Sequence, residues 1–361
     1  MRATRLEVNV DTFKENVNKI KEYIPGKEIM PVLKAHAYGT YLNKRLDILN
    51  LFKIVAVALV DEGIEIRKTG YKGDIFVLNQ PSIDEIDLIE KYDLTIGLSD
   101  LSFLEECVQK ESKMKVHIEI ETGMNRTGVK LEELEDFLNV VHTSTLNVVG
   151  IYSHFSSADF DDTYTSHQID IFEKAYQLAL DEGFVFQYVH ISASNGLLKY
   201  NLPFTNLVRP GIILYGFESY PGCFEEIDLK PVCRYVTKIT FLKQVKEGEK
   251  IGYSQNFTCL DDTNVATIPV GYGDGFRRSF SNQGYVFIRG KKAPIIGNVC
   301  MDSCMVDTTG INCQVGDEVV LFDQEHITLE ELSRIANTIN YELLCTIGER
   351  VPRVFNDEKS Q

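Results

Sequence analysis

Short apolar segments recur up to residue 216, and stretches with helical spacing and patterned charge separate most of them. Several segments are apolar almost throughout, such as IVAVALV at 54–60, which is typical of strands covered on both faces. The segments are 29–35, 54–60, 74–79, 94–99, 115–121, 147–155, 188–194 and 207–216. Eight strands alternating with helices predict an α/β fold, a parallel (β/α)8 TIM barrel.

Helical periodicity is clear between these segments, as at Phe13, Val17 and Ile20, and again within 103–108 and 169–179. Functional groups of such barrels gather at the carboxyl ends of the strands. The polar or charged residues that stand within or just after the apolar segments are Lys34, Arg126, His154, Ser194 and Arg209. We therefore expect these side chains at one end of the barrel.

After residue 228 the pattern changes to short strands and turns. The predicted strands cover 235–245, 265–270, 285–289, 294–297, 304–307 and 318–322, and a helix is predicted at 329–339. We therefore predict two domains, a TIM barrel at 1–228 and a mostly-β C-terminal domain at 229–361. They should pack closely, because no flexible linker separates them.

The charge balance argues against two classes of partner. With 37 basic and 53 acidic residues, the formal net charge is −16, which repels nucleic acid and anionic membrane surfaces. Residues 1–10 lack the apolar core of a signal peptide, and no apolar stretch is long enough to span a bilayer. We expect a cytoplasmic protein.

The eight cysteines show no paired metal-binding spacing. Cys300 and Cys304 are close in sequence, but their neighbours Met301, Met305 and Val306 favour strand packing over zinc. We predict reduced packing cysteines and no metal site.

Lys34 ends the apolar segment 29–33 and leads into a turn that contains Gly39. Burial of an ammonium group is costly unless the group is paired, neutralised or used chemically. One use is a Schiff base with a carbonyl cofactor. The alternative from this segment alone is a lysine whose amine reaches from the strand end to water.

Eight motifs resemble, in order, those of the alanine racemase family of pyridoxal-phosphate enzymes along nearly the full chain. They are VLKAHAYG at 32–39, ETGMNRTG at 121–128, SHF at 153–155, HISAS at 190–194, VRPGI at 208–212, GY at 252–253, IPVGYGDG at 268–275 and GNVCMD at 297–302. Any one of them alone is weak, whereas their collinear order is specific.

The resemblance implies that several of these motifs bind pyridoxal 5'-phosphate. Lys34 carries the cofactor, and Arg209 faces its pyridine nitrogen, with His154 bonded to Arg209. An arginine keeps that nitrogen largely unprotonated, which suits a racemase. The implied phosphate-binding groups are Tyr38, Ser194, Tyr272 and the backbone at Gly211 and Ile212.

Racemisation needs a base on each face of a planar carbanion. By the resemblance, Lys34 is one base, and Tyr253 of a second subunit is the other, so the active protein is a homodimer. Arg126 and the main chain of Met301 are implied to bind the substrate carboxylate, with Asp302 beside them.

The chain departs from the family pattern at several positions. Glu119 stands where many relatives have a carbamylated lysine, and we expect it to pair with Arg126, directly or through water. Glu349 replaces a tyrosine beside the phosphate and the substrate entrance, and Asn298 replaces an arginine on the entry path. Thr40-Tyr41 stands in place of His-Gly.

The resemblance implies an isomerase, an alanine racemase that supplies D-alanine for peptidoglycan precursors. Because of Glu349 and Asn298, a racemase for serine or several small amino acids is the alternative. A decarboxylase of the same architecture pairs the pyridine nitrogen with a carboxylate, so Arg209 argues against it. A non-catalytic cofactor carrier would need neither Tyr253 nor a β domain.

Overall fold

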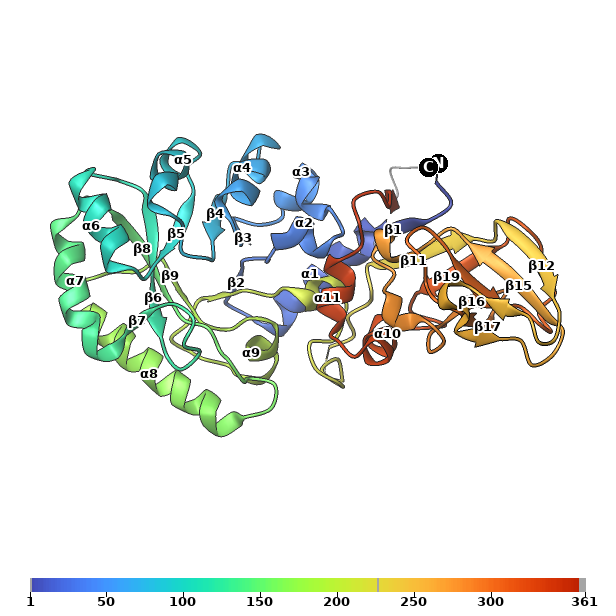
Figure 1. Cartoon of the computed structure of the whole chain (residues 1–361). Helices are drawn as coiled ribbons and strands as arrows, with labels where there is room; N and C mark the ends of the chain where they lie inside the picture. Colours follow the sequence, from blue (N-terminus) through green and yellow to red (C-terminus); the bar gives the residue numbers. More distant parts are fainter. Residues whose placement is uncertain (1, 226, 357–361) are drawn as a thin grey trace.

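The computed structural model describes residues 2–225 and 227–356. Its first part is a curled parallel sheet with helices around the outside (Figure 1). The strands pair in the order β3-β4-β5-β6-β8-β9, and β2 pairs with β10. Two parallel bridges, Val32 with Ala56 and Ala193 with Arg209, join β2 and β10 to the rest of the sheet. Within the described chain these contacts close a barrel of eight strands, as the sequence predicts.

The barrel strands coincide with or overlap the eight predicted segments. They are β2 (Glu28–Ile29), β3 (Ile54–Val57), β4 (Asp74–Val77), β5 (Thr95–Leu98), β6 (Lys115–Glu121), β8 (Asn147–Tyr152), β9 (Tyr188–His190) and β10 (Leu207–Val208). A short strand, β7 (Val129–Lys130), pairs with the end of β6.

Helices with one apolar face surround this barrel. In the first of them, the Asn9 side chain caps the helix by accepting from the Thr12 N–H at 3.0 Å, and Phe13, Val17 and Ile20 are buried. The helices are α1 (Val10–Tyr23), α2 (Lys34–Tyr38), α3 (Leu46–Leu49), α4 (Val60–Lys68), α5 (Ile86–Lys91), α6 (Leu101–Gln109), α7 (Leu134–Thr143), α8 (Asp162–Asp181) and α9 (Ser194–Lys199).

The second part of the molecule is built on a nine-stranded sheet in the described chain. In spatial order its strands are β12 (Phe241–Val245), β15 (Thr263–Ile268), β18 (Cys304–Asp307), β17 (Lys291–Ile296), β16 (Tyr285–Ile288), β19 (Glu318–Phe322), β11 (Cys233–Lys238), β1 (Arg5–Asn9) and β20 (Arg353–Asn356). A hairpin of β13 (Lys250–Ile251) and β14 (Phe257–Thr258) extends from it.

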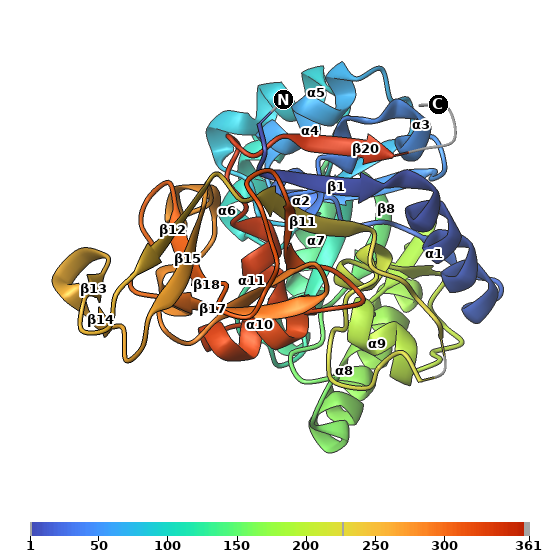
Figure 2. The same ribbon diagram turned by 90° about the vertical axis from the view of Figure 1, so that its right-hand side faces the viewer.

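Strand β1 lies in the sheet of the second part of the molecule, whereas the prediction assigns residues 1–228 to the barrel. This strand pairs antiparallel with β11 and parallel with β20, so the start of the chain belongs to the β sheet (Figure 2). Leu6 and Val8 are buried and alternate with the polar Arg5 and Glu7. Such a short alternation indicates a strand, but it does not reveal which sheet the strand joins.

Two helices follow β19, where the sequence predicts one at 329–339. The first, α10 (Leu329–Ala336), ends because Asn337 takes the left-handed conformation (φ 54°). The second, α11 (Asn340–Cys345), lies between the barrel and the β sheet (Figure 1). One hydrophobic core runs from the barrel into the sheet. No helix of the described residues combines the length and apolar character needed to cross a membrane.

Candidate functional site

A cavity of about 460 Å³ opens at the carboxyl ends of the barrel strands, and α11 supplies part of its wall. Small-molecule sites have volumes of roughly 300–1,000 Å³. The residues predicted from sequence that line this cavity are Lys34, Tyr38, Arg126, His154, Ser194, Arg209 and Gly211. Five separate strand ends bring them together, as expected for a barrel site.

Lys34 is followed by a left-handed turn. Ala35, His36, Ala37 and Tyr38 all have φ between 51° and 55°, and Gly39 follows with φ 76°. Each non-glycine residue in this conformation costs about 1–2 kcal/mol. Strain of this kind persists only where the surrounding structure enforces it, and it concentrates at functional sites.

The environment of Lys34 favours its neutral amine. Burial lowers the pKa of Lys34, and the positive charge of Arg126 lowers it further. The negative charge of Glu62 acts in the opposite direction. A neutral amine is the nucleophilic form that attacks a carbonyl group and the form that accepts a proton.

Arg209 is buried and bonded on several sides. Its Nη1 donates to His190 Nδ1 at 2.5 Å, and its Nη2 donates to His154 Nδ1 at 2.9 Å. Nη2 also donates to the carbonyl oxygens of Ser153 and Ile191. Burial lowers the pKa of Arg209 to about 10, which leaves the guanidinium cationic at neutral pH. These contacts fix a positive group in the cavity wall.

The bonds of Arg209 decide which nitrogens of the neighbouring histidines carry protons. Because an arginine only donates, Nδ1 accepts in both His190 and His154, and the proton of each neutral ring lies on Nε2. His190 Nε2 then donates to His117 Nδ1 at 2.8 Å. Burial and the charge of Arg209 lower the pKa of all three histidines. Arg209 is thus the cation of a cluster whose histidines are neutral.

Glu119 does not pair directly with Arg126, contrary to the simpler form of the prediction. Its Oε1 accepts from Thr127 Oγ1 at 2.8 Å, and Tyr152, whose hydroxyl donates to the Leu78 carbonyl at 3.4 Å, is close enough to influence the same carboxylate. Arg126 lies exposed in the loop after β6 and affects the carboxylate only through its charge. Burial raises the pKa of Glu119, and these partners partly offset that increase.

Tyr38, Ser194 and Gly211 form a close cluster in the cavity. The Gly211 N–H donates to Ser194 Oγ at 3.0 Å. A Cβ atom at Gly211 would lie 2.3 Å from the Tyr38 hydroxyl oxygen, so any larger residue there would force the Tyr38 side chain to move. The neighbouring Ile212 is fully buried. Two hydroxyls beside a backbone amide are a donor set that suits a phosphate group.

Tyr253, Tyr272 and Met301 lie on the β domain, outside this cavity in the described chain. Their exposed fractions are 71%, 45% and 53%, which is high for large side chains. Tyr253 stands between Gly252 (φ 75°) and Ser254 (φ 60°). The strained turn holds the ring of Tyr253 out from the surface.

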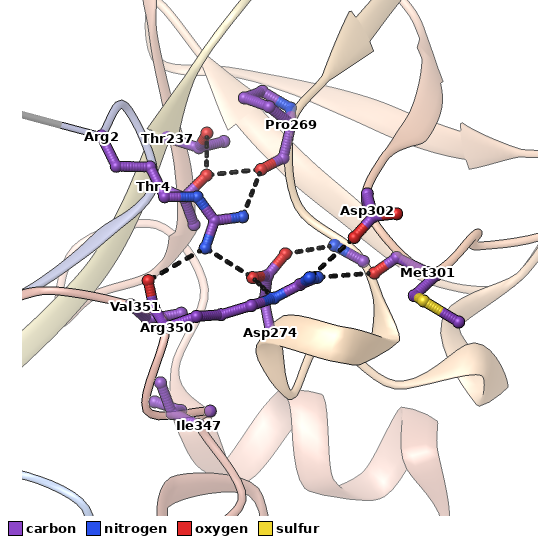
Figure 3. Close-up of polar contacts among 12 residues, drawn as sticks. Arg2, Thr4, Thr237, Pro269, Asp274, Met301, Asp302, Ile347, Arg350 and Val351 are labelled. Atoms are coloured by element: carbon purple, nitrogen blue, oxygen red, sulfur yellow. Dashed lines mark hydrogen bonds and ion pairs between the residues drawn. The ribbon is translucent and has the colours of Figure 1, made fainter.

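A polar network links Asp274 to Asp302 and the Met301 carbonyl through Arg350 (Figure 3). The buried carboxylate of Asp274 accepts from Arg350 Nε and from Arg2 Nη1, each at 2.7 Å. Arg350 also donates to Asp302 Oδ1 at 2.7 Å and to the Met301 carbonyl at 3.0 Å. Arg350 thus holds the Asp302 side chain and the Met301 carbonyl together.

Comparison of the sequence with models of known protein families identifies the family of this chain. Residues 8–219 match the model of the alanine racemase N-terminal domain, and residues 232–355 match that of the alanine racemase C-terminal domain. The chain belongs to the alanine racemase family. Family members are isomerases that depend on pyridoxal phosphate, as the sequence motifs imply.

Individual relatives align with the chain from end to end. An alanine racemase of Geobacter sulfurreducens is 39% identical, covering 98% of this chain and 97% of the relative. One of Halothermothrix orenii is 37% identical, with 99% and 98% covered. The solved alanine racemase of Clostridium difficile 630 superposes with a TM-score of 0.94 at 31% identity, covering 99% of this chain and 97% of that one.

Two departures from the family pattern, Tyr41 and Glu349, both contact His36 at the surface. The His36 ring stacks on Tyr41, with 4.7 Å between centroids, and His36 Nε2 lies 3.9 Å from Glu349 Oε1. The Glu349 side chain is 84% exposed. Asn298, by contrast, is buried and donates to the Tyr253 carbonyl at 2.8 Å. Asn298 therefore supports the turn that presents Tyr253.

Among the cavity residues that were not predicted from the sequence are Tyr152, Tyr341 and Cys345. Tyr341 and Cys345 line the cavity from α11, and the ring of Tyr152 lies 5.5 Å from the guanidinium of Arg209. Burial raises the pKa of Cys345 to about 11, which keeps the thiol protonated beside Lys34. Tyr152 precedes the SHF motif at 153–155 and could have been found there. Nothing local indicates that α11 reaches the barrel.

Proposed function

We propose that this chain interconverts L- and D-alanine in the cytoplasm, with pyridoxal phosphate bound at Lys34, and so supplies D-alanine for peptidoglycan precursors. The main support for the proposal is the set of residues that line the cavity. The cavity holds a lysine with a lowered pKa and a buried, cationic arginine within the fold of the alanine racemase family. Arg209 favours racemisation over decarboxylation, because it keeps the pyridine nitrogen unprotonated.

The cavity residues fit this cofactor. Lys34 would hold it covalently, and Arg209, supported by His154, would face its pyridine nitrogen. Tyr38, Ser194, the amides at Gly211 and Ile212, and Tyr272 would receive the phosphate, consistent with the close approach of Tyr38 and Ser194 to Gly211. When bound, pyridoxal phosphate withdraws electrons from the α-carbon of an amino acid and makes its proton acidic.

Protons are moved in this proposal by Lys34 on one face of the substrate and by Tyr253 of a partner subunit on the other. The exposed position of Tyr253, on a strained turn away from the cavity of its own chain, supports the shared site. Tyr272 and Met301 are exposed on the same domain. The homodimer is thus part of the proposal, because the site lacks its second base without the partner.

Arg126 and the main chain of Met301 would bind the carboxylate of the substrate. Arg350 supports the Met301 loop through its bonds to Asp302 and to the Met301 carbonyl. Glu119 would limit the mobility of Arg126 through its charge and through Thr127, which follows Arg126 directly.

The Glu119→Gln variant should bind alanine less well while folding at least as stably at neutral pH. Its KM for alanine should rise by about 3- to 10-fold, because a charge that orients Arg126 is lost. The unfolding temperature of the variant, by contrast, should equal or exceed that of the wild type at neutral pH. Since the pKa of Glu119 is raised in the fold, its ionisation weakens the wild type as the pH rises above 4.5.

Steady-state kinetics and unfolding temperatures at pH 5 and pH 8 test this prediction. The difference in unfolding temperature between Glu119→Gln and the wild type should grow in favour of the variant at pH 8. An unchanged KM would show that Glu119 has no part in carboxylate binding.

Substrate preference should depend on Glu349. We expect Glu349→Tyr to raise the alanine-to-serine ratio of kcat/KM by about 3- to 10-fold, because a tyrosine narrows the entrance and restores a phosphate donor. The ratio is measured by chiral chromatography with each L-amino acid in turn. Glu65→Gln is the matched control, since Glu65 is the other carboxylate that lies 3.9 Å from His36. A ratio that does not move would leave Glu349 without a role in specificity.

The function itself is tested by the rate of D-enantiomer formation from L-alanine and from L-serine with the purified, pyridoxal-phosphate-loaded protein. Fast alanine conversion with slow serine conversion would support the proposal. Comparable or faster serine conversion would favour a racemase for serine or several small amino acids. If neither is converted, the proposed function is wrong.

A further inference from the structure

The carboxylate of Glu62, in the first turn of α4, bonds to backbone at the ends of two barrel strands. Its Oε1 accepts from the Ala35 N–H at 2.6 Å. Its Oε2 accepts from the N–H groups of Ala58 at 2.8 Å and Leu59 at 3.2 Å. One side chain thus joins the residue after Lys34 to the segment that follows β3.

The bond to Ala35 falls where the backbone conformation is most demanding. Ala35 is the first residue of the left-handed turn, and its N–H lies at the start of α2, where helical N–H groups lack a partner within the helix. A carboxylate acceptor at 2.6 Å makes a charge-assisted bond, which is stronger than a neutral one. The far end of the turn is held separately, because Arg353 Nε donates to the Gly39 carbonyl at 2.8 Å.

We propose that Glu62 is a positioning residue for Lys34: by anchoring Ala35 to α4 and to the end of β3, it fixes the direction in which the lysine amine enters the cavity. The inference rests on the proposed function, in which Lys34 holds the cofactor and moves a proton. It assigns Glu62 no direct contact with the substrate.

The charge of Glu62 has a second effect on the same amine. Burial is the main cause that lowers the pKa of Lys34. Among the charged and titratable groups, Arg126 and Arg209 lower this pKa further, whereas Cys345 and Glu62 raise it. Cys345 is protonated in its buried position. Glu62 is therefore the anion that balances two arginines, and it keeps a proton on the nitrogen of Lys34 over a wider pH range.

The experiment compares Glu62→Gln with Glu85→Gln in the loaded enzyme. Glu85 accepts from the Ser82 N–H at 2.8 Å, so it makes the same kind of helix-capping bond, but it neither lines the cavity nor contributes to the pKa shift of Lys34. The readouts are the pH titration of the visible absorbance of the cofactor bound at Lys34, the rate of cofactor loss on dialysis, and kcat and KM for alanine. Circular dichroism and thermal unfolding verify that both variants are folded.

For Glu62→Gln we expect the absorbance titration to shift down by about one pH unit, a tenfold change in proton affinity. Cofactor loss should be about tenfold faster, and kcat should fall about tenfold with little change in KM, since a charged hydrogen bond is lost next to Lys34. Glu85→Gln should match the wild type in all three. If Glu62→Gln does not fold, Glu62→Asp is measured instead, which keeps the charge but is one methylene too short to reach both strand ends.

If the absorbance titration, the rate of cofactor loss and kcat all coincide for Glu62→Gln, Glu85→Gln and the wild type, Glu62 is only a helix cap and its role in positioning Lys34 is overturned, even if racemisation by the wild type is fast. A wild type that binds pyridoxal phosphate without racemising either amino acid would contradict the proposed function instead. The absorbance comparison still decides whether Glu62 positions Lys34 in that case.

Discussion

Replacing Lys34 with alanine should lower the rate of alanine racemisation by at least about 10³-fold, because in the proposed function this one residue holds the cofactor and serves as a base. The amine has no substitute in the cavity of the described chain, where Arg126 and Arg209 are the other cations and arginine does not readily release a proton. The measurement is D-alanine formation by chiral chromatography at saturating pyridoxal phosphate. The same variant should also lose the absorbance of the Lys34-bound cofactor.

Lys53→Ala is the control for this prediction. Lys53 precedes β3 in the same barrel, and its side chain is 74% exposed and paired with Glu28. Its loss should leave racemisation within about twofold of the wild type, as for most surface substitutions. A Lys34→Ala variant with comparable activity would show that the cavity is not the site of the reaction.

In the Tyr253→Phe variant, the rate of racemisation should fall by about 10²- to 10⁴-fold, because the substitution removes the proposed base on one face of the substrate and keeps the fold. Exchange of the α-proton with solvent deuterium should continue for one enantiomer of alanine, since Lys34 still acts on its own face. Mass spectrometry of each enantiomer measures this asymmetry. Tyr176→Phe, in which a tyrosine of α8 packs against Phe204, is the matched control and should behave as the wild type.

Mixed dimers test whether Tyr253 acts in the site of a partner. If it does, equal amounts of Lys34→Ala and Tyr253→Phe subunits, unfolded and refolded together, should recover about one quarter of the wild-type activity. Half of the dimers are then mixed, and each mixed dimer has one site with both bases. If Tyr253 acted within its own chain, no subunit would hold both bases and mixing would restore nothing.

The barrel could be predicted from sequence because its signals are local. A parallel strand such as β3 is covered on both faces, so its residues are apolar without interruption, and the period of the helices sets them apart. The position of Lys34 at a strand end can be predicted in the same way, because the lysine directly follows the apolar segment 29–33. The collinear motifs add the family, and with it the expectation that Arg209 and His154 meet Lys34.

Other features depend on residues far apart in the chain. Three contacts could not be predicted, because neither segment's sequence indicates its partner. They are the pairing of β1 with the β sheet, the contact of α11 with the cavity, and the hydrogen bond between Glu62 and the Ala35 N–H. The burial of Glu119 beside Thr127 and Tyr152, in place of a direct pair with Arg126, is decided in the same way.

The sequence by itself therefore determined the alternation of strands and helices in the barrel, the family and the residues expected to carry the chemistry, because hydrophobic periodicity and motif spacing are properties of neighbouring residues. Only the tertiary structure decided which ring nitrogen of each histidine around Arg209 carries the proton and which groups shift the pKa of Lys34. It also decided which carboxylate anchors the turn that follows Lys34. Those properties depend on burial and on distances of a few ångströms between side chains, which arise only when the barrel closes and the β domain packs against it.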